Sequence, residues 1–223
     1  MKVFIITIEG MDSSERLAAK CFESAKSLGY QPFYFMAYTK DDSIELLDEH
    51  GIKPISDTSY PYFDLYNKWT PVPGTRGCFA SHYALWNVCY EFNEPIIIME
   101  HDAIMLNEWS DPDWKDILHL DWEGSIRRRK MRNGFDSYNN VQENSVFRMG
   151  FSPGETSGII SMNCCYAYAI KPHAAAKLIE QAKSIGWFAA DRFIHEPIVN
   201  IETIHPKIAE EQPEAVEMFT TAF

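Results

Sequence analysis

The most distinctive hydrophobic pattern in the chain is an unbroken apolar run at residues 96–99, between Pro95 and an acidic cluster. Three of its residues are β-branched isoleucines, and no polar position alternates with them. A short run without alternation is typical of a strand that is buried on both faces, as in a parallel sheet. We therefore expect a central strand that carries Glu100, His101 and Asp102 at its carboxyl end.

The amino-terminal pattern predicts a strand, a helix and a second strand in succession. Residues 3–8 form an apolar run, and apolar positions then recur at helical spacing over residues 13–28. Gly29 ends this pattern, and residues 32–36 are again largely apolar. A helix that joins two strands usually forms a right-handed parallel unit, so the fold is expected to be of the α/β class.

The longest helical pattern covers residues 74–92 and leads directly into the central strand. Its apolar positions recur every three or four residues, which places them on one face directed at the sheet. The remaining apolar runs predict a helix over residues 172–184 and strands over residues 116–120, 163–170 and 197–204. This order predicts a mixed, mostly parallel sheet flanked by helices.

The composition is that of an ordinary globular protein. The chain has 223 residues, of which 46% are apolar and 23% are charged, and this length suits one domain. We expect that domain over residues 1–208, followed by a tail at 209–223. The net charge of -12 argues against a general nucleic-acid binder, which needs a basic surface, and against docking on an anionic membrane.

The five cysteines are scattered, without a CxxC pair or the spacing of a zinc site. Thiols distributed in this way are typical of small buried side chains in a reducing compartment. The first apolar run is too short for a signal peptide, and no apolar stretch approaches the ~20 residues of a membrane span. We therefore expect a cytoplasmic protein without a transmembrane segment.

The acidic cluster after the central strand is the first candidate site. Side chains at positions i and i+2 of an extended segment point the same way, so Glu100 and Asp102 are expected to share one site, with His101 turned aside. Ligands of open α/β sheets gather at such strand ends. Two carboxylates suit Mg²⁺ or Mn²⁺, and that ion suits a phosphorylated substrate. Alternatively, the two acids only end the strand and cap the next helix.

A second candidate is the one basic run of this acidic chain, which lies at residues 127–132 and holds four arginines and a lysine. One interpretation is a solvated loop. The other is a mobile loop that closes on a diphosphate or on an anionic acceptor. The run alone does not decide between the two.

Four short motifs follow one another along the chain: Gly-Cys-x-x-Ser-His at 77–82, Glu-x-Asp-Ala at 100–103, Tyr-Ala-Tyr at 166–168, and a later acid, Asp191. In this order they resemble glycosyltransferase family 25, the lipooligosaccharide and collagen galactosyltransferase group. The resemblance extends over most of the chain. It implies a GT-A-like fold, a nucleotide-sugar donor (usually a UDP-sugar), a saccharide or glycoconjugate acceptor, and a divalent ion, Mn²⁺ or Mg²⁺.

The resemblance also assigns binding roles to single residues. Asp102 and Glu100 match the outer positions of the acidic motif and are the implied metal ligands, and Glu100 would also reach the donor. His205, just after the last expected strand, is a further candidate ligand, as a late histidine is in some GT-A enzymes. The implied donor contacts in and beside the first motif are Arg76, Ser81 and His82.

Asp191 matches the late acid of the family and is the candidate general base. It would remove the proton from the acceptor hydroxyl as that oxygen attacks the anomeric carbon of the sugar. The family is expected to invert the anomeric configuration, and galactose or glucose is the expected sugar.

The chain departs from the family at His101, where the family usually has Asp. One acid fewer weakens a site for a hard cation, because imidazole favours softer ions. Two alternatives to a sugar transferase therefore stay open. The first is a metal-dependent hydrolase or phosphotransferase that uses Glu100, His101, Asp102 and His205, and the second is a non-catalytic relative that binds a nucleotide or a carbohydrate.

Overall fold

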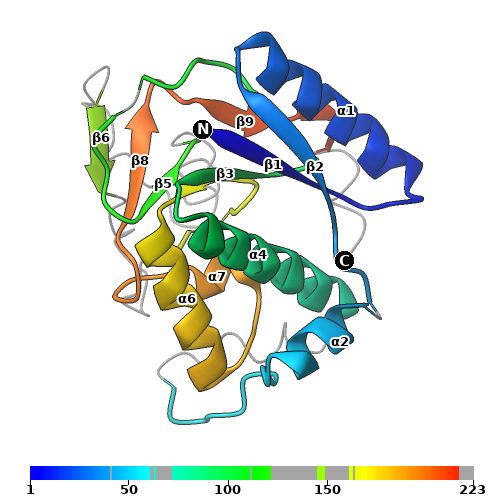
Figure 1. The fold of residues 1–223 in the computed structure, drawn as a ribbon, viewed down its shortest axis with the longest axis vertical. Coiled ribbons are helices and arrows are strands. Elements are labelled where there is room, and N and C mark those ends of the chain that lie inside the picture. Colours follow the sequence, from blue (N-terminus) through cyan, green and yellow to red (C-terminus); the bar gives the residue numbers. More distant parts are fainter. Residues whose placement is uncertain are drawn as a thin grey trace, which may run out of the picture.

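The computed structural model describes residues 1–40, 42–60, 63, 72–110, 112–121, 145–148, 161–162 and 164–215. Figure 1 shows its ribbon and element labels. The strands are β1 (Lys2–Thr7), β2 (Gln31–Met36), β3 (Ile96–Glu100), β4 (Ala103–Met105), β5 (Ile117–His119), β6 (Ser145–Arg148), β7 (Ala167–Ile170), β8 (Ile201–His205) and β9 (Ala209–Glu211). The helices are α1 (Asp12–Ser27), α2 (Asp42–Glu49), α4 (Pro73–Phe92), α6 (Pro172–Ile185) and α7 (Ala190–Phe193).

Seven of the described strands form one sheet in the order β2-β1-β3-β7-β5-β8-β6, and β4 and β9 pair separately. β1 is parallel to both β2 and β3, and β5 is parallel to β8. β7 runs antiparallel to β3 and β5, and β6 runs antiparallel to β8. Five of the seven strands therefore point the same way. The expected mixed, mostly parallel sheet flanked by helices is confirmed.

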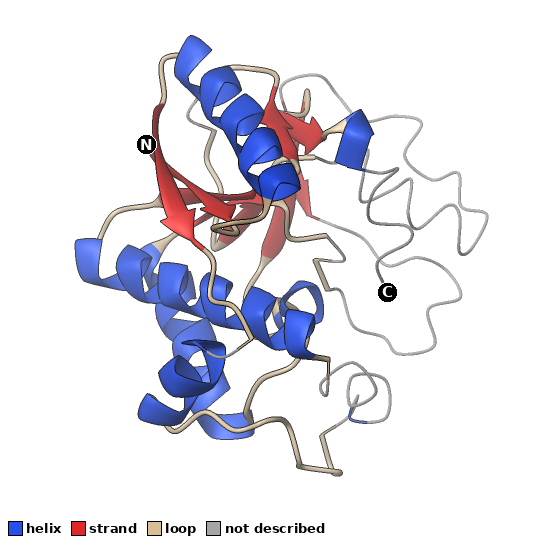
Figure 2. Cartoon of the chain, turned by 90° about the vertical axis from the view of Figure 1, so that its right-hand side faces the viewer, coloured by secondary structure: helices blue, strands red, loops and turns tan. Residues whose placement is uncertain are grey.

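The helices cover the two faces of the sheet unequally. α1 packs on one face, whereas α2, α4, α6 and α7 lie on the other (Figures 1 and 2). β3 contributes side chains to the hydrophobic cores on both faces of the sheet. Ile96 and Ile98 belong to the core on the α4 side, and Ile97 and Met99 belong to the core on the α1 side. All four side chains are fully buried. The expectation of a strand buried on both faces is therefore correct.

The strand order reverses at β1. After β1 the chain crosses one face as α1 and adds β2 on one side, and it then crosses the other face through α4 and adds β3 on the opposite side. Residues 2–36 thus form the expected parallel unit, with Lys2 opposite Gln31 and Thr7 opposite Met36. In open α/β sheets, such a reversal leaves a crevice at the carboxyl ends of the flanking strands.

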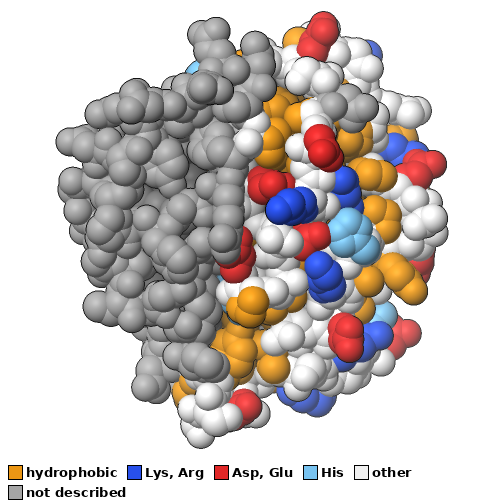
Figure 3. Space-filling view, turned by 90° about the vertical axis from the view of Figure 1, so that its left-hand side faces the viewer, with side chains coloured by type: hydrophobic (Ala, Val, Ile, Leu, Met, Phe, Trp, Pro, Cys, Tyr) orange, Lys and Arg blue, Asp and Glu red, His pale blue; other side chains and the backbone are white. Residues whose placement is uncertain are grey.

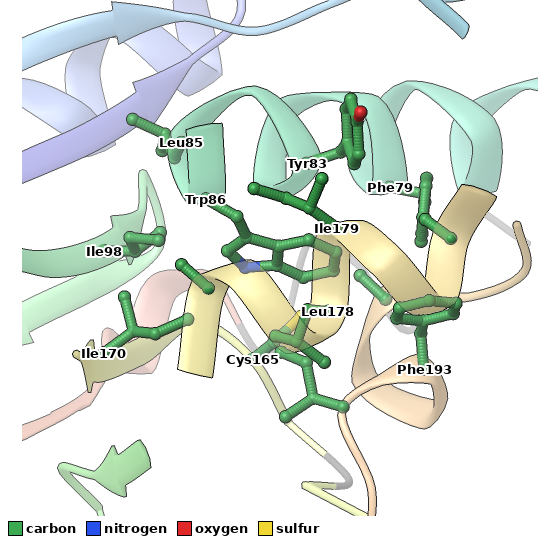
Figure 4. Close-up of a cluster of buried hydrophobic side chains, with 14 of the residues drawn as sticks. Phe79, Tyr83, Leu85, Trp86, Ile98, Cys165, Ile170, Leu178, Ile179 and Phe193 are labelled. Atoms are coloured by element: carbon green, nitrogen blue, oxygen red, sulfur yellow. The ribbon is translucent and has the colours of Figure 1, made fainter. Parts of the chain in front are cut away.

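Aromatic packing fixes α4 against its neighbours. Its side chains Phe79, Tyr83 and Trp86 are fully buried, and Trp86 stacks on Phe193 of α7 with ring centroids 5.7 Å apart. Figure 4 shows these rings beside aliphatic side chains of α6. Pro73 occupies the first turn, where its missing N–H costs nothing. The helix ends at Phe92, and the next residue, Asn93, has a positive φ of 51° that suits a carboxyl-terminal cap.

The expected boundary at residue 208 falls just before a segment that packs on the domain. β9 pairs with β4, and the side-chain amide of Gln212 donates to the carbonyl oxygens of Leu17 and Ala103. Glu214 forms ion pairs with Arg16 and Lys20 of α1. These two short strands were not expected, because runs of three residues carry no readable periodicity.

Two of the predicted strands are shorter in the structure, and one predicted feature lies outside the described residues. The strand expected over residues 163–170 is limited to β7, and the one over residues 197–204 begins four residues later as β8. The basic run at 127–132 lies outside the described residues. On the face seen in Figure 3, acidic and basic side chains lie next to one another in the described part of the surface, with hydrophobic side chains between them. Within the described residues, no helix is long and apolar enough to cross a membrane.

Shortening a side chain of β3 tests the buried-strand assignment. We expect Ile97→Ala to lower the free energy of unfolding by about 2–5 kcal/mol, because it removes a fully buried side chain and leaves a cavity. Denaturant unfolding measures the change. Ile44→Ala is the matched control, since Ile44 is 44% exposed on α2, and it should change stability by no more than about 0.5 kcal/mol. A cost below about 1 kcal/mol for Ile97→Ala would contradict the assignment.

Candidate functional site

A pocket of about 280 Å³ lies where the strand order reverses. Its wall combines the carboxyl ends of β1, β2 and β3 with the first three turns of α4. Ile8 and Tyr38 contribute from the ends of β1 and β2, and Glu100 and His101 from the end of β3. The remaining described lining residues are Ile6, Ala37, Thr39, Lys40, Pro73, Gly74, Gly77, Cys78, Ser81 and His82. The position is the one expected for the ligand site of an open α/β sheet.

Close contact between α4 and the segment after β2 shapes this pocket. A Cβ atom added to Gly77 would lie only 2.6 Å from the carbonyl oxygen of Tyr38, so only glycine permits this approach. The hydroxyl of Ser81 accepts a hydrogen bond from the backbone N–H of Tyr38 at 2.9 Å and donates to the carbonyl of Gly77 at 2.8 Å. Ser81 therefore lines the pocket and also holds its two walls together.

His82 connects the pocket to the core. Trp86 donates its indole N–H to the hydroxyl of Tyr168 at 2.9 Å, and that hydroxyl lies 2.9 Å from Nδ1 of His82. On the other side of the ring, Nε2 of His82 lies 3.1 Å from Oε1 of Glu100. His82 is fully buried. Its orientation is consequently set by a chain of hydrogen bonds that begins in the core and ends at the pocket.

Two cysteine side chains lie beside Glu100 and His82 and complete a cluster of four residues. The Sγ atom of Cys165 lies 3.2 Å from Oε1 of Glu100, and the Sγ atom of Cys78 lies 3.9 Å from it. Cys165 is buried, whereas Cys78 is exposed in the pocket wall. One potential ligand atom from each of the four residues lies within 4.8 Å of those from the other three.

The ionisable groups in this cluster shift one another's pKa values. Burial alone would lower the pKa of His82, but hydrogen bonds with Cys78 and Glu100, together with their negative charges, raise it to about 10. Burial opposes the ionisation of Glu100, yet the hydrogen bond and the charge of His82 lower its pKa. A hydrogen bond with Cys165 lowers the pKa of the Cys78 thiol to about 7, and a hydrogen bond and the positive charge of His82 act in the same direction. The pKa of Cys165 rises.

The acidic motif is not extended through all three residues. β3 ends at Glu100, and His101 and Asp102 form a turn before β4. The alternation that was expected to aim Glu100 and Asp102 at one site therefore stops at Glu100. Asp102 raises the pKa of the Cys21 thiol in α1, on the opposite face of the sheet, although burial raises it more. His101, which we expected to be turned aside, lines the pocket.

Two further candidates, Arg76 and Asp191, are not among the residues that line the pocket. Arg76 donates to the hydroxyl of Ser43 at 3.0 Å and to the carbonyl of Lys40, so its described contacts tie α4 to the start of α2. Asp191, in α7, lies 3.7 Å from Arg192. The charge of Asp191 is one of the smaller causes that raise the pKa of Cys165, which couples it to the cluster.

The metal ligands implied by the resemblance are not all brought together. His205 is the last residue of β8, where it pairs with Ser145 of β6. In the described part of the chain, the group of potential ligands around Glu100 contains neither Asp102 nor His205. Metal binding by those two residues stays a prediction.

The two cysteines of the cluster were missed because scattered thiols were interpreted as inert core residues. Cys78 and His82 are four residues apart on one helix, and that spacing was the available signal. Nothing in the sequence indicates that Cys165 reaches them.

A second cavity, of about 600 Å³, lies at the opposite edge of the sheet. It is lined by the start of β1 and β2 and by Glu94, Glu108 and Trp109. Its cations are Lys2, whose Nζ lies 2.8 Å from Oε2 of Glu94, and the amino group of Met1. Glu94 and Glu108 balance these two charges, so the cavity does not favour an anion. The smaller pocket, which has Lys40 in its wall, is the better candidate for a phosphorylated ligand.

The fold and the pocket define an α/β protein with a ligand site at the reversal of strand order. The model of glycosyltransferase family 25 (LPS biosynthesis protein) matches residues 2–194, and the chain belongs to that family. It is therefore a glycosyltransferase, and the two alternatives left open by the sequence are set aside.

Other comparisons add little to this assignment. No curated protein matches the chain. Among solved structures, the crystal structure of mouse xyloside xylosyltransferase 1 in its apo form is similar over 86% of this chain and 80% of that chain, with 9% sequence identity and a TM-score of 0.35. A similarity at that level does not by itself establish a common fold.

Two glycine substitutions in α4 test the close contact that shapes the pocket. We expect Gly77→Ala to destabilise the protein by about 1–3 kcal/mol, because the added methyl group meets the backbone of Tyr38, which cannot rotate away. Gly74→Ala is the control, since a Cβ there meets nothing within 4 Å and alanine favours a helix. Thermal unfolding of both variants gives the comparison. Equal stability of the two variants would show that the contact is not tight.

Proposed function

We propose that the protein transfers a sugar from a UDP-sugar donor to a hydroxyl group of a saccharide or glycoconjugate acceptor, within a GT-A-like domain. The observation that carries the proposal is the pocket at the carboxyl ends of β1, β2 and β3, in a chain of glycosyltransferase family 25. Tyr38 offers an aromatic ring for the base, and Lys40 offers a cation for the diphosphate. Free thiols at all five cysteines suit the predicted cytoplasmic location.

In the proposed reaction Asp191 acts as the general base. Its carboxylate takes the proton of the acceptor hydroxyl while the hydroxyl oxygen forms a bond to the anomeric carbon of the sugar. The bond between that carbon and the diphosphate oxygen breaks, and the nucleoside diphosphate leaves with the electron pair. Attack from the face opposite the leaving group inverts the anomeric configuration. Galactose and glucose are the proposed sugars, as the resemblance implies.

A divalent ion is also part of the family expectation, and when bound it would neutralise charge on the departing diphosphate. Mn²⁺ and Mg²⁺ prefer oxygen ligands. The described group around Glu100 offers two thiols, an imidazole and one carboxylate instead. This donor set does not fit a hard ion, so no step of the proposed transfer passes through such an ion.

A panel of nucleotide sugars tests donor class and metal dependence together. We expect one UDP-sugar to raise the midpoint of thermal unfolding, because a ligand at about 100 times its Kd stabilises the folded state by about 2.7 kcal/mol. The stabilisation should shrink in chelator, since a divalent ion beside Glu100 would add a positive charge for the diphosphate beyond that of His82. Restoration by Mn²⁺, Mg²⁺ or Zn²⁺ identifies the ion. No shift with any donor would count against the proposal.

Replacing the proposed base tests the chemistry. We expect Asp191→Asn to lower the transfer rate about 10²–10⁴-fold, the usual contribution of a general base, and to leave donor binding unchanged. Asp48→Asn is the control, because Asp48 is on the surface of α2 with a side chain that is 55% exposed. Product formation and donor binding are measured on the same preparations. Unchanged transfer by Asp191→Asn would remove this residue from the base role.

A further inference from the structure

The four potential ligand atoms of the cluster around Glu100 lie within 4.8 Å of one another, close enough to surround one ion. Oε1 of Glu100 lies 3.1 Å from Nε2 of His82, 3.2 Å from Sγ of Cys165 and 3.9 Å from Sγ of Cys78. A tetrahedral zinc ion with bonds of about 2.0–2.3 Å keeps its ligand atoms roughly 3.3–3.8 Å apart. The three separations from Glu100 are therefore close to those of a zinc site, and the other separations are no larger than 4.8 Å.

The chemistry of the cluster also selects among cations. Thiolate sulfur is a soft ligand and imidazole a borderline one, and both favour Zn²⁺ over Mg²⁺ or Mn²⁺. Zn²⁺ accepts sulfur, nitrogen and carboxylate oxygen ligands, all of which the cluster supplies, whereas a hard ion would find a single carboxylate. We propose that Cys78, His82, Glu100 and Cys165 bind one Zn²⁺ ion at the floor of the pocket.

Rigid elements hold these four residues. Cys78 and His82 are one turn apart on α4, so they project from the same face of the helix. Glu100 ends β3, and Cys165 lies two residues before β7, which pairs with β3. Figure 4 labels Cys165 in the core that α4 and α6 share. Such anchoring is what a preorganised metal site requires.

Hydrogen bonding behind the imidazole completes the site. A histidine that binds a metal through one nitrogen usually has its other nitrogen held by a hydrogen bond, which fixes the ring. Nδ1 of His82 is held in this way by the hydroxyl of Tyr168, which also accepts a hydrogen bond from Trp86. Nε2 is then directed at Glu100 and available to the ion.

The position of the ion would connect it to the proposed donor site. Three of the four ligands line the pocket, and the exposed Cys78 gives an entry path. A cation at this place would contact an anionic group of a ligand that is bound in the pocket. This connection rests on the proposed function, but metal binding itself does not, and a metal titration uses neither donor nor acceptor.

Cobalt titration of the reduced, metal-free protein is the direct test. We expect one Co²⁺ ion per chain, visible-region d–d bands with the intensity of a tetrahedral complex, and a sulfur-to-cobalt charge-transfer band in the ultraviolet. Zn²⁺ should displace the cobalt and abolish these bands. Weak bands typical of an octahedral complex, or the absence of the sulfur band, would overturn the proposal.

Cysteine variants assign the signal to the site. Cys78→Ser and Cys165→Ser should each lose the charge-transfer intensity and weaken Zn²⁺ binding by at least about tenfold, because a thiolate ligand is removed. Cys89→Ser is the matched control on α4, since its thiol donates to the carbonyl oxygens of Glu94 and Ile170 and does not belong to the cluster around Glu100. It should bind Zn²⁺ as the wild type does. Equal binding by all three variants would place the ion elsewhere.

Two further measurements keep the proposal testable if Cys165→Ser does not fold. Zn²⁺ should slow alkylation of Cys78 in the wild-type protein, because a coordinated thiolate is a poorer nucleophile. Tyr168→Phe should weaken Zn²⁺ binding roughly 10- to 100-fold by freeing the His82 ring. A disulfide between Cys78 and Cys165 in the protein as isolated, unaffected by Zn²⁺, would contradict the proposal.

Discussion

The reversal of strand order at β1 is the constraint on which the site depends. β2 and β3 add to opposite sides of β1, so the connecting helices must lie on opposite faces and the carboxyl ends of three parallel strands open into one crevice. α4 closes that crevice and is fixed by buried aromatic rings on its inner face. Gly77 and Ser81 determine how closely α4 approaches the exit of β2. The pocket is therefore a consequence of topology, and its width is a consequence of two small side chains.

A carboxylate at the inner end of a central strand creates an electrostatic requirement. Ionised Glu100 is stable there only if nearby groups compensate its charge. His82 does so directly, and its raised pKa together with the lowered pKa of Glu100 shows the mutual stabilisation. The thiols of Cys78 and Cys165 complete the surroundings. A divalent ion would satisfy the same requirement, which is why one cluster serves as an ion pair or as a metal ligand set.

Local pattern predicted the elements that carry strong periodicity. The isoleucine run of β3 and the amphipathic α4 were readable because each is long enough to bury a defined face. The turn after Glu100 was not readable, since a sequence does not state where extended backbone ends. That turn separates Asp102 from Glu100 and brings His101 to the pocket wall.

Contacts between segments that are far apart in the chain could not be predicted from the sequence. Ser81, His82 and Glu100 were named as candidates, and the structure places all three in the pocket wall. Cys165 reaches Glu100 only because β7 inserts antiparallel beside β3, and no local pattern encodes that pairing. The same holds for β9, whose three residues pair with β4 far away in the chain.

The most direct test of the proposed donor site is a crystal structure of the protein with the UDP-sugar selected by thermal stabilisation, or with UDP. We expect the nucleotide in the pocket at the carboxyl ends of the parallel strands, with its base near Tyr38 and its diphosphate near Lys40. A nucleotide bound in the cavity at the amino ends, beside Tyr30 and Trp109, would contradict the assignment of the donor site.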